Sequence, residues 1–195
     1  MKLALLTSIL ALIITGCAAP SRLTNLENVQ PNEVAVIAKF SLSHNGSPTS
    51  LGNVVLSDIS DTSFKVIGKI DQFQPDGQNY IFAKLLVGKH YYLQSLVYGS
   101  GMAQKTFQPD FVSFDVKPGG PQYLGDVSVD LIGIGATAAT AIGLVTNIIG
   151  QTIVNMTGDY TASVTDDAAS AQLAFNKKFG TTTPLTLNLG IAAAN

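Results

Sequence analysis

From residue 33 onward, the chain consists of short apolar runs separated by glycine, proline, asparagine and aspartate. The first run has apolar side chains at every second position, namely Val34, Val36, Ala38 and Phe40. This spacing places them on one face of a β-strand. The polar stretch from Ser43 to Pro48 predicts the turn that ends this strand. Such a pattern, repeated along a chain, favours an all-β sandwich or barrel.

Further strands are predicted at short intervals after the first. Gly88-Lys89 separates the runs Tyr80–Val87 and His90–Tyr98 and predicts a tight hairpin between them. The runs are Val54–Leu56, a stretch around Phe64, Val66 and Ile70, Tyr80–Val87, His90–Tyr98, Phe111–Val116 and Tyr123–Asp130. The side chains predicted to lie in the core are Phe64, Val66, Leu93, Phe114 and Val127.

Three short motifs follow one another in this region. They are Gly88-Lys89-His90-Tyr91-Tyr92-Leu93, Phe114-Asp115-Val116-Lys117-Pro118-Gly119 and Tyr123-Leu124-Gly125-Asp126-Val127. This order resembles a set of uncharacterised bacterial lipoproteins that carry "G-x-Y-Y-L", "F-x-V-x-P-G" and "Y-[IL]-G" motifs, although the first motif here has one extra residue. The resemblance covers roughly residues 88–129. It implies an immunoglobulin-like or transthyretin-like β-sandwich, and it transfers no catalytic residue.

The first twenty residues resemble the leader of a bacterial lipoprotein. Lys2 precedes the uncharged stretch Leu3–Ile14, and Ile14-Thr15-Gly16-Cys17 then matches a lipobox. The resemblance implies removal of residues 1–16 and attachment of lipid, with acyl chains such as palmitate, to Cys17. Ala18-Ala19 after the cysteine implies the outer membrane, facing the periplasm. The alternative is an ordinary signal peptide that is cleaved near Ala18-Ala19, which would remove Cys17.

Residues 17–32 are predicted to be the acylated N-terminus and a tether between membrane and domain. Pro20 and Pro31 lie near its two ends, and the stretch between them is mostly polar. Leu23, Leu26 and Val29 are too sparse to predict a buried face. The sandwich itself is predicted to occupy residues 33–130.

Residues 131–158 contain 28 positions without Asp, Glu, Lys, Arg or His. Leu131–Gly150 is long enough to cross a membrane as a helix, but it contains four glycines. Three interpretations remain open. The segment could extend the preceding strand and add a hairpin, form a small-residue helix packed on the sandwich, or form a helix that inserts into membrane or joins copies of the chain.

A strand, an amphipathic helix and a tail are predicted for residues 159–195. Thr165 or Asp166 is the predicted N-cap, and Gly180 is the predicted end of the helix. A stripe of apolar side chains predicts its buried face, namely Ala168, Ala171, Phe175 and Phe179. Pro184–Leu189 could add a last strand, and Ile191–Asn195 is predicted to be a loose tail.

Composition and spacing offer little catalytic chemistry. Charged residues make up 12% of the chain and its net charge is −2, which disfavours binding to nucleic acid. His44 and His90 are isolated, and the pairs Asp58 with Asp61 and Asp71 with Asp76 match no known calcium loop. We therefore expect no catalytic residue, no metal site and no cofactor.

These observations predict a non-enzymatic outer-membrane lipoprotein with a structural or adaptor role in the bacterial envelope. Its predicted partners are the membrane, through lipid on Cys17, and other envelope proteins. Two alternatives stay open: a periplasmic module that binds glycan or another small ligand through exposed tyrosines, and a subunit of a membrane-embedded homo- or hetero-oligomer. The aromatic residues between Tyr80 and Tyr123 favour a sandwich core with a few aromatic residues at its edge, and a carbohydrate-stacking face is the alternative.

Overall fold

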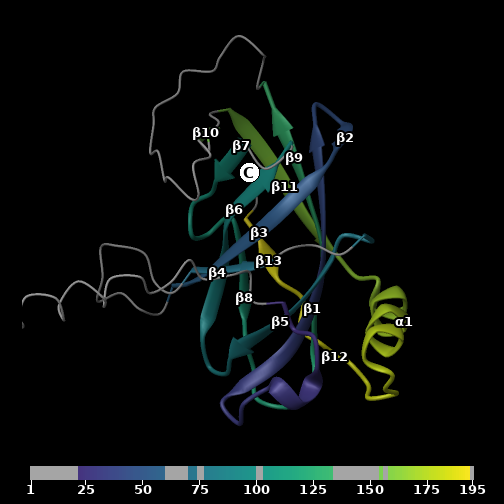
Figure 1. The fold of residues 1–195 in the computed structure, drawn as a ribbon. Helices are drawn as coiled ribbons and strands as arrows, with labels where there is room; N and C mark the ends of the chain where they lie inside the picture. Colours follow the sequence, from purple (N-terminus) through teal and green to yellow (C-terminus); the bar gives the residue numbers. More distant parts are fainter. Residues whose placement is uncertain are drawn as a thin grey trace, which may run out of the picture.

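The computed structural model describes residues 22–59, 70–73, 77–99, 103–133, 154–155 and 158–193. These residues form two β-sheets and one α-helix, so the prediction of a mainly β protein with a C-terminal helix is confirmed (Figure 1). The two sheets face each other as a β-sandwich. The closer assignment to an immunoglobulin-like or transthyretin-like sandwich stays a prediction.

The first sheet is built around a long parallel pair, β1 (Glu33–His44) and β9 (Gln122–Ile132). On one edge of β1, β5 pairs with its first half and β2 with its last residues. On the free edge of β9, β12 and β11 pair with successive stretches. The remaining strands of this sheet are β2 (Ser47–Thr49), β5 (Tyr80–Leu86), β11 (Asp159–Thr165) and β12 (Thr186–Leu187).

The second sheet is centred on the antiparallel pair of β3 (Leu51–Asp58) and β6 (His90–Tyr98). On the edge of β6 opposite β3, β8 pairs with the first residues of β6 and β7 pairs with its last residues. The remaining strands are β4 (Ile70–Phe73), β7 (Ala103–Thr106), β8 (Val112–Asp115), β10 (Val154–Asn155) and β13 (Ile191–Ala192).

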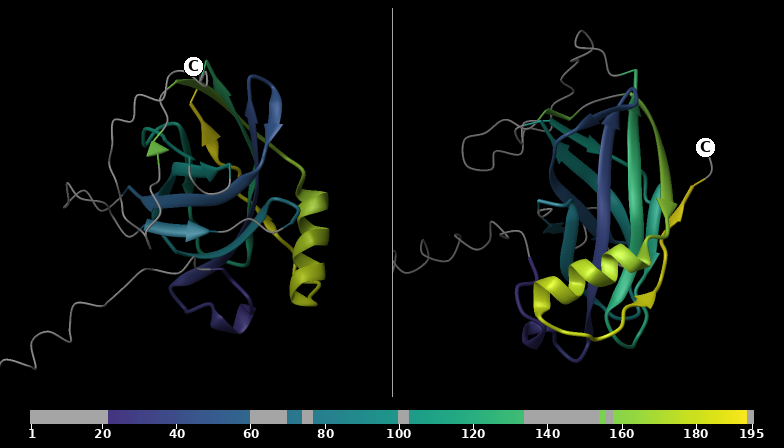
Figure 2. Two further views of the ribbon diagram at one scale, coloured as in Figure 1. Left: turned by 45° about the horizontal axis from the view of Figure 1, so that its top comes forward. Right: turned by 90° about the vertical axis from the view of Figure 1, so that its right-hand side faces the viewer.

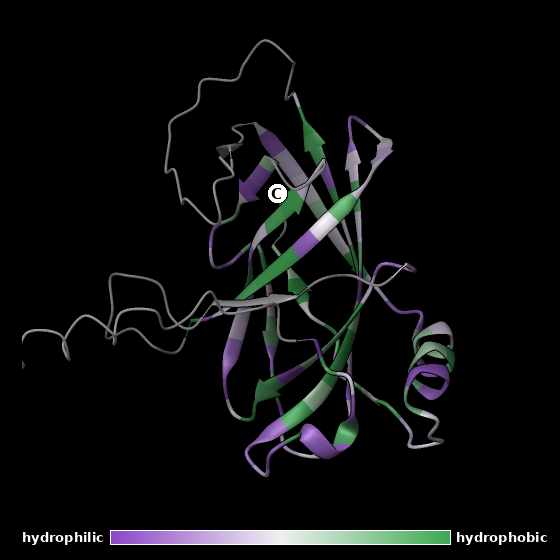
Figure 3. Cartoon of the chain, in the orientation of Figure 1, coloured by the Kyte–Doolittle hydropathy of each residue, from purple (hydrophilic) through white to green (hydrophobic). Residues whose placement is uncertain are grey.

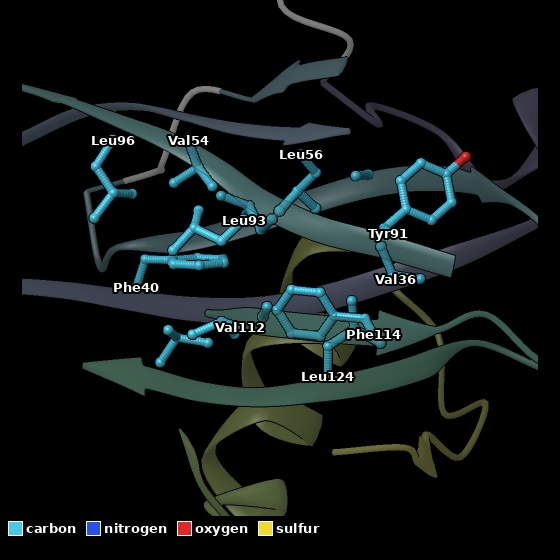
Figure 4. Close-up of a cluster of buried hydrophobic side chains, with 14 of the residues drawn as sticks. Val36, Phe40, Val54, Leu56, Tyr91, Leu93, Leu96, Val112, Phe114 and Leu124 are labelled. Carbon is cyan, nitrogen blue, oxygen red and sulfur yellow. The ribbon is translucent and has the colours of Figure 1, made fainter. Parts of the chain in front are cut away.

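The main core lies between the two sheets. Phe40 of β1, Leu56 of β3 and Leu124 of β9 are completely buried there, and side chains from both layers interdigitate (Figure 4). Leu93, Phe114 and Val127 belong to this core, as predicted. The other two predicted core residues, Phe64 and Val66, lie outside the described residues.

The predicted hairpin at Gly88-Lys89 is wrong. β5 pairs with β1 in the first sheet, whereas β6 pairs with β3, β7 and β8 in the second. The short connection crosses from one layer to the other, and Gly88 adopts a positive φ of 75° and donates its N–H to the carbonyl of Val116. Both runs have apolar faces that can be buried in either arrangement, so their pattern and spacing do not distinguish a hairpin from a change of sheet.

A second core covers the outer face of the first sheet. Ala35 and Ile37, which alternate with the predicted inward residues of β1, are buried against Ala171 and Phe175 of the helix α1 (Ala168–Phe179). β1 is therefore buried on both faces. Figure 2 shows α1 lying across this side of the sheet and ending next to the N-terminal segment.

From Arg22 onward, the N-terminal segment packs on this second core, whereas the sequence predicts a tether without a buried face. Leu23 is buried and donates its N–H to the carbonyl of Phe82 over 2.8 Å. Leu26, in the 3-10 helix η1 (Leu26–Asn28), and Val29 pack against the same cluster. Three spaced apolar residues are sufficient here because α1 already provides an apolar surface beside them.

The helix ends confirm most of the prediction. Gly180 ends α1 in a left-handed conformation, with φ of 62°. Its N-cap is Asp167, whose side chain accepts the N–H of Ser170, so the predicted N-caps Thr165 and Asp166 are wrong by one or two positions. Asp166 accepts the N–H of Ala168 instead.

The predicted loose tail is also wrong in part. β12 pairs with β9 in the first sheet, and β13 then pairs with β8 in the second. Between them, Asn188 and Gly190 donate their N–H groups to the carbonyls of Tyr123 and Leu124. The last strands therefore join the edges of the two sheets, and the sandwich includes strands outside the predicted range 33–130.

The uncharged segment 131–158 falls mostly outside the described residues. Its beginning extends β9 as far as Ile132, and Asp159 of β11 pairs with that residue. These ends agree with the interpretation that extends the strand and adds a hairpin partner, while residues 134–153 are not described. Among the described residues, no helix is long and apolar enough to span a membrane.

Candidate functional site

Cys17, the predicted site of lipid attachment, lies outside the described residues, which begin at Arg22. The structure therefore describes where the chain that follows Cys17 joins the domain. It joins beside β5, where the N–H of Leu23 binds the carbonyl of Phe82. Arg22 is exposed at this point.

Two hollows flank this junction. The first has a volume of about 350 Å³ and is lined by Arg22, Leu23, Thr24, Asn28, Gln30 and Lys84. The second, of about 390 Å³, is lined by Gln78, Phe82, Ala174, Lys177 and Lys178. We call the surface around Arg22, Lys84, Lys177 and Lys178 the N-terminal face.

The N-terminal face holds its cations in different ways. Lys84 lies 3.1 Å from a carboxylate oxygen of Glu33 and donates to the carbonyl of Asn28. The ammonium of Lys178 lies 4.9 Å from the centre of the Phe82 ring, a cation–π contact. Lys177 is on the last turn of α1 and faces the second hollow.

The two predicted histidines lie apart. Nδ1 of His90 is 2.6 Å from a carboxylate oxygen of Asp115 on the neighbouring strand β8, and both side chains are exposed. His44 is at the opposite end of the sandwich, at the end of β1. Sequence analysis missed the His90–Asp115 pair because the two residues are 25 positions apart and meet only through strand pairing.

The candidate carboxylate pairs are not assembled in the described structure. Asp58 forms an ion pair of 3.0 Å with Lys89, which explains its position without a ligand. Asp61 and Asp76 are outside the described residues, and the side chain of Asp71 is not described. Within the described ranges, no group of three His, Cys, Asp or Glu residues is placed to hold a metal ion.

A buried network links the helix to the first sheet. The hydroxyl of Tyr123 donates to Asp126 over 2.7 Å and accepts the N–H of Asp167 over 3.0 Å. The other carboxylate oxygen of Asp126 lies 3.2 Å from the ammonium of Lys39. Burial, followed by the hydrogen bond to Asp126, raises the pKa of Tyr123, and the hydrogen bond to Asp126 raises the pKa of Lys39.

Lys105 is a buried cation that sequence analysis missed. Its ammonium donates to the carbonyl of Gly158 over 2.7 Å and lies 4.8 Å from the centre of the Tyr160 ring. Burial lowers its pKa, and the nearby charge of Asp159 acts in the opposite direction. This contact joins β7 of the second sheet to the chain just before β11 of the first sheet, where the uncharged segment ends.

At the same end of the sandwich, the β1–β2 turn is bound to the end of β9. Asp130 accepts hydrogen bonds from the hydroxyl of Ser43 and the N–H of Gly46, and these bonds lower its pKa. The side chain of Asn45 accepts the N–H of Gly133 over 3.2 Å. The residues that precede the undescribed stretch 134–153 are therefore held in place.

The aromatic residues between Tyr80 and Tyr123 mostly fill the interior. Tyr92 and Tyr98 are half-buried on β6. The buried ones are Tyr80, Phe82, Tyr91, Phe107, Phe111, Phe114 and Tyr123. Their burial agrees with the core interpretation and leaves no row of exposed aromatic rings in this part of the described structure.

Comparison of the chain with models of protein families, with curated proteins and with solved structures finds no match.

Proposed function

We propose that this protein is a non-enzymatic lipoprotein of the bacterial outer membrane, anchored through lipid on Cys17, which acts as an adaptor to other envelope proteins. Support for the anchor comes from the sequence, where an uncharged stretch leads into Ile14-Thr15-Gly16-Cys17. Support for the adaptor role comes from the separation between the two ends of β1.

The observation that carries the adaptor role is the orientation of β1. Its first residue, Glu33, follows directly after the N-terminal segment, and its last residue, His44, pairs with Leu131 at the start of the uncharged segment. A strand of 12 residues spans about 36 Å from end to end. A domain held at one end by a lipid would present the other end well away from the anchoring site.

Lipid attachment is tested by mass spectrometry of the protein purified from membranes. We expect an acylated N-terminal Cys17, and we expect Cys17→Ser to accumulate as an unprocessed precursor. Ala18→Asp is the matched variant. By resemblance, an Asp after the acylated cysteine retains the protein at the inner membrane without preventing acylation, so we expect this variant to be acylated and to remain in the inner membrane. A mature N-terminus beyond Cys17 would refute the proposal.

The adaptor role is tested by photo-crosslinking in cells. A photoreactive residue in place of Asn45, at the end distant from the anchor, should give one discrete adduct with another envelope protein. The same residue in place of Glu27, beside the anchor, serves as the control and should not give that adduct. An adduct between two copies at Asn45 would favour the multimeric alternative instead.

A further inference from the structure

The two hollows of the N-terminal face share one lining chemistry. Arg22 and Lys84 line the first, Lys177 and Lys178 line the second, and the other lining groups are amides, a hydroxyl and apolar side chains. No carboxylate side chain of the described residues lines either hollow. Guanidinium and ammonium groups that converge with amide donors suit the oxygens of a phosphate group.

The hollows are neighbours on one surface. Phe82 connects them, because its carbonyl accepts the N–H of Leu23 in the first and its ring lies under the ammonium of Lys178 in the second. Figure 2 shows the end of α1 beside the N-terminal segment. The carboxylates Asp166 and Asp167 lie at the opposite end of the helix, where they cap its first turn.

Among the described residues, the two nearby acids, Glu27 and Glu33, do not balance the four cations of this face. Glu33 pairs with Lys84, and Glu27 of η1 accepts a hydrogen bond from the side-chain amide of Asn25, the N-cap of η1. Neither Arg22 nor Lys177 has a carboxylate within ion-pair distance in the described part of the chain. Figure 3 shows a hydrophilic turn in the lower part of α1 and mixed hydrophilic and hydrophobic colouring on the N-terminal segment.

The chain length between the anchor and this surface is short. Arg22 follows Cys17 by five residues, which span at most about 18 Å when fully extended. An acyl chain on Cys17 would therefore hold the N-terminal face close to the headgroups. Cations within about one Debye length of an anionic membrane, roughly 8 Å at physiological salt, are attracted to it.

We propose that the N-terminal face lies against the membrane and that its cations bind the phosphate groups of anionic lipid headgroups. The contact fixes the orientation of the domain on the bilayer, which a single flexible attachment at Cys17 does not. This proposal rests on the proposed function only for the anchor that brings the face to the membrane.

Amine footprinting of the protein on vesicles tests the contact. The acylated protein is reconstituted into vesicles of phosphatidylcholine alone or with 30% phosphatidylglycerol and treated with an amine-reactive reagent. We expect labelling of Lys177 and Lys178 to slow about fivefold on the anionic vesicles, the factor that corresponds to the attraction of one cation. The protection should disappear in 0.5 M NaCl. Equal labelling on both kinds of vesicle would overturn the proposal.

Substitutions of Lys177 and Lys178 test whether the protection depends on their charge, and the labelling rate of Lys84 is the readout. Lys177→Gln with Lys178→Gln should abolish the protection of Lys84 on anionic vesicles, whereas Lys177→Arg with Lys178→Arg should preserve it. Lys89→Gln is the control for net charge of the single variant Lys177→Gln, because each removes one positive charge and Lys89 pairs with Asp58 and lines neither hollow. If the double glutamine variant fails to fold, Lys177→Gln alone replaces it. Loss of protection in Lys89→Gln as well would reduce the effect to net charge and overturn the proposal.

Two further experiments distinguish failure of the membrane contact from failure of the proposed function. Protection of Lys177 by 10 mM inorganic phosphate without vesicles would indicate a site for a soluble anion and overturn the membrane contact. If Cys17 proves not to be acylated, the full chain is coupled to a maleimide phospholipid through that residue, the single cysteine of the sequence. Protection in that sample supports the membrane contact even if the proposed function fails, and its absence overturns the contact.

Discussion

Single residues decide how the helix is joined to the sandwich. Tyr123 is fully buried on β9, and its hydroxyl donates to Asp126 of the same strand and accepts the N–H of Asp167, the N-cap of α1. A buried hydroxyl with both a donor and an acceptor partner stabilises the fold, and removing it leaves both partners without their bond. The sequence indicates a capping acid near residue 166, but it does not indicate that a tyrosine 44 positions earlier binds the same turn.

Tyr123→Phe should lower the free energy of unfolding by about 1–3 kcal/mol at pH 7. The raised pKa of Tyr123 adds a pH dependence, because the unfolded state loses the phenol proton near pH 10 while the folded state retains it. Stability should therefore fall as the pH rises above about 10, and Tyr123→Phe should show a smaller fall. Urea unfolding between pH 8 and 11 measures both effects.

Tyr92→Phe is the control for this experiment, because Tyr92 is half-buried on β6 and away from the helix. It leaves the hydrogen bonds of the Tyr123 hydroxyl in place, so its loss of stability at pH 7 should be smaller than that of Tyr123→Phe. Equal alkaline slopes in Tyr123→Phe and the unsubstituted protein would contradict the assignment.

Gly125 allows β9 and β11 to lie close together, because it has no side chain. Gly125 of β9 has a φ of 111°, and a Cβ atom there would lie 2.5 Å from a methyl carbon of Val164 on β11. Both the backbone conformation and the lack of space require glycine. The motif Tyr123-Leu124-Gly125 is visible in the sequence, but this reason for its glycine is visible only in the pairing of β9 with β11.

The sequence predicts which face of α1 is buried, but it does not predict which surface covers that face. The stripe of Ala168, Ala171, Phe175 and Phe179 predicts which side of the helix is buried. The structure shows that the stripe covers the outer face of β1, whose alternating residues Ala35 and Ile37 are buried there. Periodicity identifies an apolar face of an element but does not identify what covers it.

Phe175→Ala should lower the free energy of unfolding by about 3–5 kcal/mol, because its ring is completely buried against the first sheet. Leu173→Ala on the same helix is the matched control, because Leu173 is 70% exposed, and it should change the stability by less than about 0.5 kcal/mol. Chemical denaturation of both variants provides the measurement. A similar loss in the two variants would mean that the docked face has been misassigned.

In the whole molecule, the edges of the two sheets are covered by segments that are distant in sequence. Residues 186–192 pair first with β9 and then with β8, and Lys105 of β7 binds the carbonyl of Gly158 before β11. Phe107, Phe111 and Tyr160 pack together at the same edge, with ring centres 4.5 to 5.0 Å apart. The contacts of Lys105 and Tyr160 connect the two sheets close to Gly158, where the uncharged segment ends.

Deletion of residues 134–153 tests how the uncharged segment is accommodated. Even a dozen exposed apolar side chains, at about 1.5 kcal/mol each, would be an unfavourable surface for a monomer. We expect the lipid-free domain to be a monomer that loses stability on deletion, which indicates packing on the sandwich. Light scattering with thermal unfolding measures both properties. An oligomer that becomes a folded monomer on deletion would support assembly through this segment instead.

The sequence by itself determined the fold class, most strand positions, the end of the helix and the inward residues Leu93, Phe114 and Val127, because these follow from local periodicity and capping. Tertiary structure alone decided that β5 and β6 belong to different sheets and that residues 191–192 form an edge strand. It also decided that Leu23 is buried and that the cations of the N-terminal face converge. The physical reason is that an apolar pattern specifies a face to be buried, whereas the partner that covers it depends on pairing between residues far apart in the chain.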